Sequence, residues 1–270
     1  SINWGRLVPQ IVYYFAAYAQ LLKAGRITFG DEVDFCVPTG NFGDILAGYF
    51  AKRMGLPVGR LICASNRNDV LTDFLSTGVY DKRRTFYKTT SPSMDILVSS
   101  NLERLLSLLT GDDDYVSGLM KDLNELGHYK VTDELLQKLQ AEFSCGCCDD
   151  DAAARTIGRV WAREKYLCDP HTAVAWTVAD QFIHMHRDGV PVVVLSTASP
   201  YKFPTAVLSA LGQRVADDEF AVMEDLRTCT GVPVPKNLAS LRQKPVRHTD
   251  VIDREDMLDY VLQKAGEAQW

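Results

Sequence analysis

The chain has 270 residues, 46% hydrophobic and 24% charged, with a formal net charge of −6. This length and composition are enough to bury a substantial core, as one large domain or two small ones. The acidic balance and the lack of a basic tract give no reason to expect nucleic acid as a partner, and no apolar run reaches the length that a membrane-crossing helix needs.

The N-terminus does not carry the charged head, apolar stretch and small-residue cleavage site of a signal peptide. Seven cysteines are an odd number and are unevenly spaced, which argues against a secreted disulfide scaffold. We therefore predict a reduced, cytoplasmic protein that binds neither membrane nor nucleic acid.

The first half of the chain alternates helical and strand-like patterns. Apolar residues repeat at helical intervals from Leu7 to Leu22 and predict a long helix that ends near Gly25. The next patterns predict a strand over 33–37, a helix over 42–54, a strand over 60–64 and a short helix over 70–76. This alternation predicts parallel strands joined by right-handed crossovers.

The second half is mainly helical. The patterns predict helices over 101–109, two more amphipathic helices through Phe143, helices over 151–164 and 172–187, a strand over 190–195 and a helix over 204–211. Prolines after about residue 230 predict an extended arm that a helix over 254–265 closes. We predict an α/β domain over 1–230, with a mainly parallel sheet flanked by helices, on which residues 231–270 pack.

Three closely spaced cysteines, Cys145, Cys147 and Cys148, precede a predicted helix. Neighbouring thiolates can contribute to a zinc site, but no second CxxC or HxxxH pattern follows them. We predict no metal site, and interpret this segment as a surface loop.

Residues 38–48, PTGNFGDILAG, directly follow the first predicted strand and open a helix. A strand that feeds a short glycine loop at a helix start presents free backbone N–H groups at the positive end of the helix dipole, which suits a phosphate. Gly40 and Gly43 allow a tight turn and a close approach of the backbone to an anion. The spacing alone leaves an anion site and a plain strand-to-helix turn as equal alternatives. For Asp44, direct contact with a ligand and an ordinary first-turn position both stay open.

The loop and four other segments, in the same order, resemble the threonine synthases, which are pyridoxal-phosphate enzymes of the tryptophan-synthase-β class. The segments are SINWGRLVPQIVYYF at 1–15, PTGNFGDILAGYFAKRMGLP at 38–57, SPSMDILVSSNLERLL at 91–106, YLCDPHTAVAW at 166–176 and LSTASPYKFP at 195–204. The resemblance spans residue 1 to about residue 211. It implies the large-domain portion of a fold-type-II pyridoxal-phosphate enzyme.

The resemblance also implies which residues bind the cofactor, pyridoxal 5'-phosphate. The cofactor phosphate would lie on the backbone of Gly40, Asn41, Phe42, Gly43 and Asp44. The hydroxyl of Thr197, just after the last predicted strand, would meet the pyridine nitrogen. The chain departs from the common family spelling TAHPAKF at Ser199 and Tyr201, and these two changes leave Thr197 intact.

A substrate that carries both a carboxylate and a phosphate needs amide, hydroxyl and guanidinium donors. The candidate substrate-binding residues are Asn3, Arg6, Ser100, Asn101 and Arg104. Ser100 and Asn101 are equally suited to cap a helix. Asp169 or Thr172 can cap the helix that follows, and His171 is a candidate wall of the active site.

Threonine synthases hold the cofactor as a Schiff base on a lysine in an upstream segment that resembles SFKD. Nothing in this sequence matches that segment, and Lys202, although close to the right loop, is not the matching lysine. We therefore assign no catalytic residue, and expect the carboxyl-terminal half of an enzyme whose amino-terminal half is missing. The resemblance implies that the parent converts O-phospho-L-homoserine and water to L-threonine and phosphate, and that this chain alone is inactive. The alternative is a non-catalytic threonine-synthase-like remnant or a phosphate-binding module.

Overall fold

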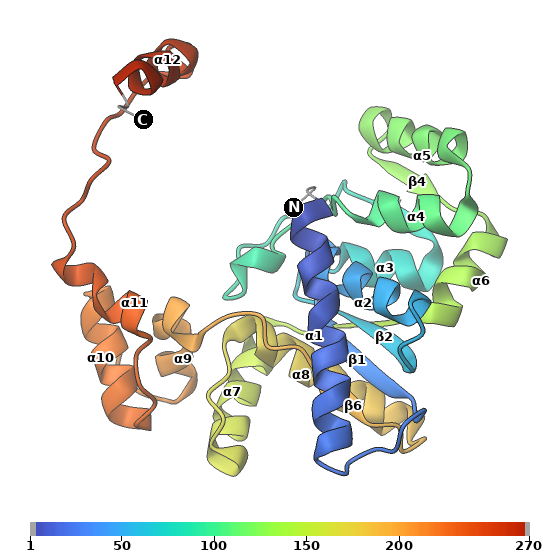
Figure 1. Cartoon of the computed structure of the whole chain (residues 1–270), viewed down its shortest axis with the longest axis horizontal. Helices are drawn as coiled ribbons and strands as arrows, with labels where there is room; N and C mark the ends of the chain where they lie inside the picture. Colours follow the sequence, from blue (N-terminus) through green and yellow to red (C-terminus); the bar gives the residue numbers. More distant parts are fainter. Residues whose placement is uncertain (1–3, 268–270) are drawn as a thin grey trace. The chain divides into compact units, whose positions relative to one another are not determined.

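The computed structural model describes residues 4–267 of the chain (Figure 1). It divides into two compact units, with the boundary between Pro233 and Val234. The first unit contains the sheet and most of the helices, and the second contains the end of the chain. Each unit is described by itself.

A four-stranded parallel sheet forms the centre of the first unit, in the order β5-β2-β1-β6. Its strands are β1 Val33–Pro38, β2 Val58–Ser65, β5 Phe143–Cys147 and β6 Val192–Val194. Every residue of β1 is buried, as expected of a central parallel strand with helices on both faces. The parallel pairing confirms the prediction from the sequence.

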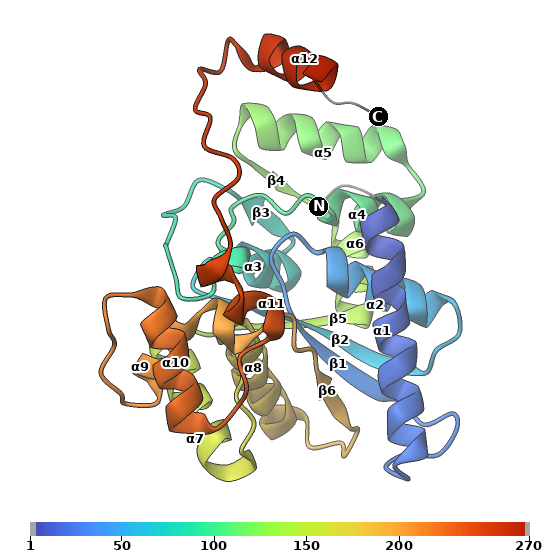
Figure 2. The ribbon, with the colours of Figure 1, turned by 60° about the vertical axis from the view of Figure 1, so that its left-hand side comes forward.

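Helices cover the sheet on both faces (Figures 1 and 2). On one side, α2 Gly43–Arg53 packs on β1 and β2, and α1 Trp4–Lys23 packs on α2. On the other side, α8 Pro170–His186 contacts all four strands, and α7 Asp150–Glu164 packs on α8. The contact between α1 and α2 is close, since a Cβ on Gly48 would lie 2.6 Å from the ring of Tyr14.

A smaller layer extends from one edge of the sheet. The strands β3 Val79–Asp81 and β4 His128–Lys130 pair antiparallel and carry the stacked rings of Tyr80 and Tyr129. The helices of this layer are α3 Val70–Thr77, α4 Leu102–Thr110, α5 Asp113–Glu125 and α6 Asp133–Glu142. Leucines of α4, α5 and α6 belong to the main hydrophobic core, so this layer is continuous with the sheet region.

The first unit ends with α9 Pro204–Ala210 and α10 Glu219–Thr230, and two single 3-10 turns occur at Pro92–Met94 and Pro200–Lys202. The second unit contains α11 Lys236–Ala239, a 3-10 turn at Leu241–Gln243 and α12 Met257–Glu267. The predicted terminal helix is therefore present, shifted by two or three residues. Its packing on the first unit stays a prediction.

The interpretation of the cysteine segment as a surface loop was wrong. Residues 143–147 form β5, which pairs with β2 in the main sheet, and Cys148 is buried. Among residues 4–267, no three His, Cys, Asp or Glu side chains gather as metal ligands would. Nor does any helix in this range combine the length and the apolar character needed to cross a membrane.

Candidate functional site

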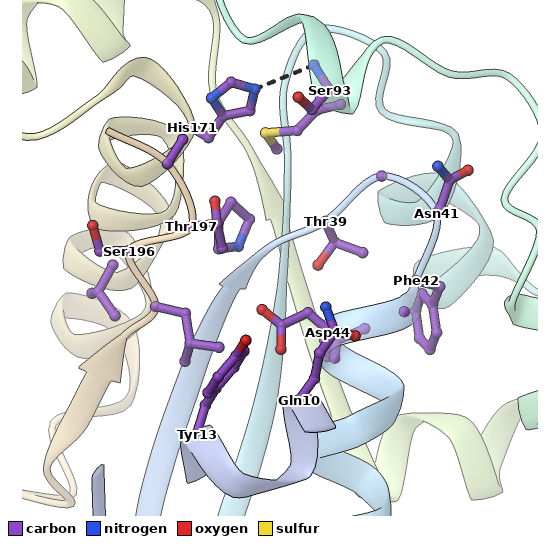
Figure 3. Close-up of a pocket in the computed structure, with 18 of the residues that line it drawn as sticks. Gln10, Tyr13, Thr39, Asn41, Phe42, Asp44, Ser93, His171, Ser196 and Thr197 are labelled. Atoms are coloured by element: carbon purple, nitrogen blue, oxygen red, sulfur yellow. Dashed lines mark hydrogen bonds between the residues drawn. The ribbon is translucent and has the colours of Figure 1, made fainter. Parts of the chain in front are cut away.

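Two loops leave neighbouring parallel strands at the same edge of the sheet. Cys36 of β1 is paired with Val194 of β6, and Thr39 and Thr197 each lie three residues beyond this pair. A pocket of about 840 Å³ lies between the loops. Its lining includes residues 38–45, residues 193–198 and one side of α1, and Figure 3 shows Thr39 and Asp44 on one side with Ser196 and Thr197 on the other. This is the edge at which open α/β sheets bind ligands.

The loop from β1 to α2 presents a row of unused backbone donors. Within residues 4–267, the N–H groups of residues 40–45 donate to no protein acceptor, whereas that of Leu46 bonds to the Phe42 carbonyl. Phe42 has a left-handed backbone with φ of 62°, and its ring is buried against Phe143. A left-handed residue within such a row turns successive N–H groups toward one concavity, which suits an anion.

Position 40 must be a glycine because the segment at Ser93 lies close against it. A Cβ at this position would lie 2.7 Å from the carbonyl oxygen of Ser93, closer than non-bonded atoms approach. Residues 93 and 94 also line the pocket. The glycine therefore allows the segment at residues 93 and 94 to lie against the loop from β1 to α2.

Asp44 lies in the first turn of α2 and lines the pocket. The Tyr14 hydroxyl donates to its backbone carbonyl at 2.7 Å and lies 3.4 Å from its carboxylate. Burial raises the pKa of Asp44 to about 6, although the hydrogen bond from Tyr14 opposes this shift. The carboxylate therefore titrates near neutral pH, beside the unused donors.

The hydroxyls of Thr197 and Ser196 differ in their hydrogen-bond partners. The Tyr166 hydroxyl donates to Ser196 Oγ at 2.8 Å, and the Thr172 hydroxyl lies 3.2 Å from the same atom. The Thr197 hydroxyl has no hydrogen-bond partner in the described part of the chain. Of the two, Thr197 is the one available to a ligand in the pocket.

His171 is a buried wall of the pocket with a defined tautomer. Asp169 caps α8, accepting hydrogen bonds from the His171 backbone N–H and from Nδ1, each at 2.9 Å. Nε2 accepts from the Ser93 backbone N–H at 3.2 Å (Figure 3). A nitrogen that accepts carries no proton, so this imidazole is neutral and joins the segment at residue 93 to α8.

The candidate substrate residues are not all brought together. Arg6 lines the pocket, whereas Ser100, Asn101 and Arg104 are absent from its described lining. Asn3 lies outside the described residues. Asn101 is the N-cap residue of α4, without a capping side-chain bond, and its side chain is completely buried.

Some lining residues escaped the sequence analysis. Gln10 and Tyr13 of α1 face the pocket one and two turns after Arg6. Their spacing on the predicted helix was a signal that could have identified them, because residues four and seven apart share a helical face. Lys202 also lines the pocket and is exposed to solvent.

Comparison with known proteins finds similarity to threonine synthases. A family model described as "Threonine synthase, C-terminal" matches residues 172–261. Threonine synthase-like 1 of Macaca fascicularis is 47% identical over 213 residues, which cover 78% of this chain and 28% of that protein. Threonine synthase of Pseudomonas aeruginosa is 45% identical over 218 residues, covering 80% of this chain and 45% of that protein.

A crystal structure of threonine synthase from Brucella melitensis, solved with pyridoxal phosphate bound, superposes with a TM-score of 0.83 at 39% identity. The superposition covers 99% of this chain and 52% of that one. The chain is similar to the carboxyl-terminal part of threonine synthases. The predicted fold class, a mainly parallel sheet flanked by helices in the fold-type-II threonine synthase family, is confirmed, and the chain spans half or less of the curated threonine synthases it matches.

Proposed function

We propose that this chain forms the cofactor-phosphate side of a pyridoxal-phosphate-dependent threonine synthase, a carbon-oxygen lyase of threonine biosynthesis. The row of unused N–H groups over residues 40–45, opposite an unpaired Thr197 hydroxyl in one pocket, carries this proposal. The donor set fits a phosphate ester at one end and a ring nitrogen at the other.

When bound, pyridoxal phosphate supplies an electron sink for bond cleavage in an amino acid. The chain's own residues bind and orient. Residues 40–44 hold the phosphate, Thr197 donates to or accepts from the pyridine nitrogen, and neutral His171 forms a fixed wall. Because a hydroxyl does not force the ring nitrogen to be protonated as a carboxylate would, Thr197 would temper the electron-withdrawing character of the ring.

The reaction that we propose for the whole protein converts O-phospho-L-homoserine and water to L-threonine and phosphate, in the cytoplasm. Arg6 and Lys202 provide positive charge in the pocket for an anionic substrate. The remaining substrate candidates, Asn3, Ser100, Asn101 and Arg104, stay proposals. Lys202 is not assigned as the lysine that holds the cofactor, and we propose that this lysine belongs to an amino-terminal half.

A second candidate function is a threonine-synthase-like protein without the synthase activity. The 47% identity to a protein named threonine synthase-like 1, against 45% to a named threonine synthase, supports keeping it. Both candidates have the loop over residues 40–45, which we call the anion loop, and they differ in the reaction.

An assay of the protein that carries this chain separates them. Incubation with O-phospho-L-homoserine and pyridoxal 5'-phosphate should release phosphate and form threonine in equal amounts. Binding of the cofactor without either product would favour the threonine-synthase-like alternative, and failure to bind the cofactor would contradict both.

A further inference from the structure

The carbonyl groups of the anion loop are held by a separate segment of the chain, Ser99–Asn101. The Ser99 hydroxyl donates to the Gly40 carbonyl at 2.9 Å. Asn101 donates twice to the Asn41 carbonyl, from its backbone N–H at 3.1 Å and from Nδ2 at 2.7 Å. Two successive carbonyls of the loop thus receive three hydrogen bonds from one direction.

The hydrogen bonds to the two carbonyls also determine which way the neighbouring backbone N–H groups point. In a planar trans peptide the C=O of one residue and the N–H of the next point in opposite directions. Fixing the carbonyls of Gly40 and Asn41 therefore directs the N–H groups of Asn41 and Phe42 away from the Ser99–Asn101 segment. Gly40, Asn41 and Phe42 line the pocket, and Ser99 and Asn101 are not part of its described lining, so the opposite side is the pocket.

The orientation of the Asn101 amide is itself fixed. An Arg104 nitrogen donates to Asn101 Oδ1 at 2.9 Å, and a guanidinium can only donate. Oδ1 must therefore face Arg104, which leaves Nδ2 for the loop. Ser99 and Asn101 are both buried, with exposures of 7% and 0%, so water does not compete easily for these bonds.

The loop needs such support because its conformation is strained. A non-glycine residue in the left-handed region costs about 1 kcal/mol or more, and Phe42 has a φ of 62°. Strain of this kind persists where neighbouring contacts fix the backbone.

From this geometry we infer that Ser99 and Asn101 are positioning residues for the phosphate of the bound ligand: they act through the loop carbonyls and touch neither ligand nor reacting atoms. This inference rests on the proposed function and gives Asn101 a role different from the substrate contact predicted from the sequence. It identifies the ligand group that they serve as a phosphate monoester, since the N–H groups of Asn41 and Phe42 are the ones they direct.

The test compares two ligands that differ only in the phosphate. The 270-residue chain is titrated with pyridoxamine 5'-phosphate and with pyridoxamine, whose amines form no adventitious linkage to lysines. The quantity measured is the dissociation constant of pyridoxamine divided by that of pyridoxamine 5'-phosphate. In the unaltered chain this ratio should be about 100 or more, since several charge-assisted hydrogen bonds are involved.

Asn101→Ala and Ser99→Ala should each lower this ratio about tenfold, through weaker binding of the phosphorylated ligand alone. Ser99→Thr keeps the hydroxyl and should restore most of it. Thr156→Val is the matched control: it removes a buried bond of 2.8 Å to Thr177, between α7 and α8, so it should lower thermal stability without changing the ratio.

Three results are informative. A ratio that falls in the Asn101 and Ser99 variants but not in Thr156→Val supports the inference. A high ratio in the unaltered chain that both variants keep overturns the inference and leaves the proposed function intact. A ratio near one in the unaltered chain overturns the proposed function and the inference with it.

Discussion

Asp44 places a titratable carboxylate beside the unused N–H groups. Its pKa is about 6 because burial disfavours the charged form. Below this pH the neutral acid tolerates an anion in the pocket, whereas above it the carboxylate repels one. Sulfate, whose charge is constant in this range, should bind about tenfold more weakly at about pH 7.5 than at about pH 5.

Asp44→Asn is the control for this titration. The variant keeps Tyr14, Arg6, Lys202 and His171, so any pH dependence from these groups remains in both proteins. Calorimetry should find sulfate affinity nearly constant in Asp44→Asn. An equal fall in affinity in both proteins would show that a different group is responsible.

Thr197 and the anion loop contact opposite ends of the proposed ligand, which makes their effects separable. Thr197→Val should weaken pyridoxamine and pyridoxamine 5'-phosphate by the same factor, about tenfold or less, because one hydrogen bond to the ring is lost and the phosphate contacts remain. In the whole protein the same change should lower turnover. Ser196→Ala serves as the comparison, and a larger effect there would show that Ser196 contacts the ring instead.

At the scale of elements, the loop depends on how closely α1 packs on α2. A Cβ on Gly48 would lie within 2.8 Å of both the Tyr14 ring and a methyl group of Leu61. Gly48→Ala should therefore lower the free energy of unfolding by about 1–3 kcal/mol through overpacking. Gly118→Ala, at an exposed position of α5 with nothing within 4 Å, should raise the free energy of unfolding by about 0.5–1 kcal/mol. Urea denaturation measures both, and a neutral Gly48→Ala would contradict the close packing.

Elements with a strong apolar pattern were predictable from the sequence, and those decided by tertiary contacts were not. The helices at α1, α2 and α8 and the strands at β1 and β2 follow local periodicity. The sequence FSCGC of β5 has little strand propensity, and pairing with β2 determines its structure. Gly146 is required there because α8 packs so closely that a Cβ would lie 2.9 Å from Val178.

The same distinction holds within the site. The position of the glycine loop and Thr197 at one sheet edge was predictable, since both follow parallel strands that end there. The positions of Asn101 and Ser99 behind the loop were not, because they depend on how residues separated by about 60 positions meet. Donor side chains near a resembling motif suggested substrate contacts, and only the fold shows which face of the loop they reach.

At the scale of the whole molecule, α1 exposes an apolar stripe. Trp4, Val8, Val12 and Phe15 lie on one helical face and are 37–61% exposed. Exposed apolar faces of this kind favour association. We expect the isolated 270-residue chain to self-associate through α1, so that Val12→Lys shifts the sedimentation profile toward monomer. Ala19→Lys, near the end of the same face, should have a smaller effect, and a monomeric unaltered chain would contradict the expectation.

The central claim is that the backbone of residues 40–44 binds the phosphate of a pyridoxal-type cofactor. A crystal structure of the chain with pyridoxal 5'-phosphate tests it most directly. We predict density for the phosphate with oxygens about 2.7–3.2 Å from the loop nitrogens, and with the pyridine ring directed toward Thr197. Phosphate density held by Arg6 and Lys202, with the loop N–H groups left unengaged, would contradict the claim.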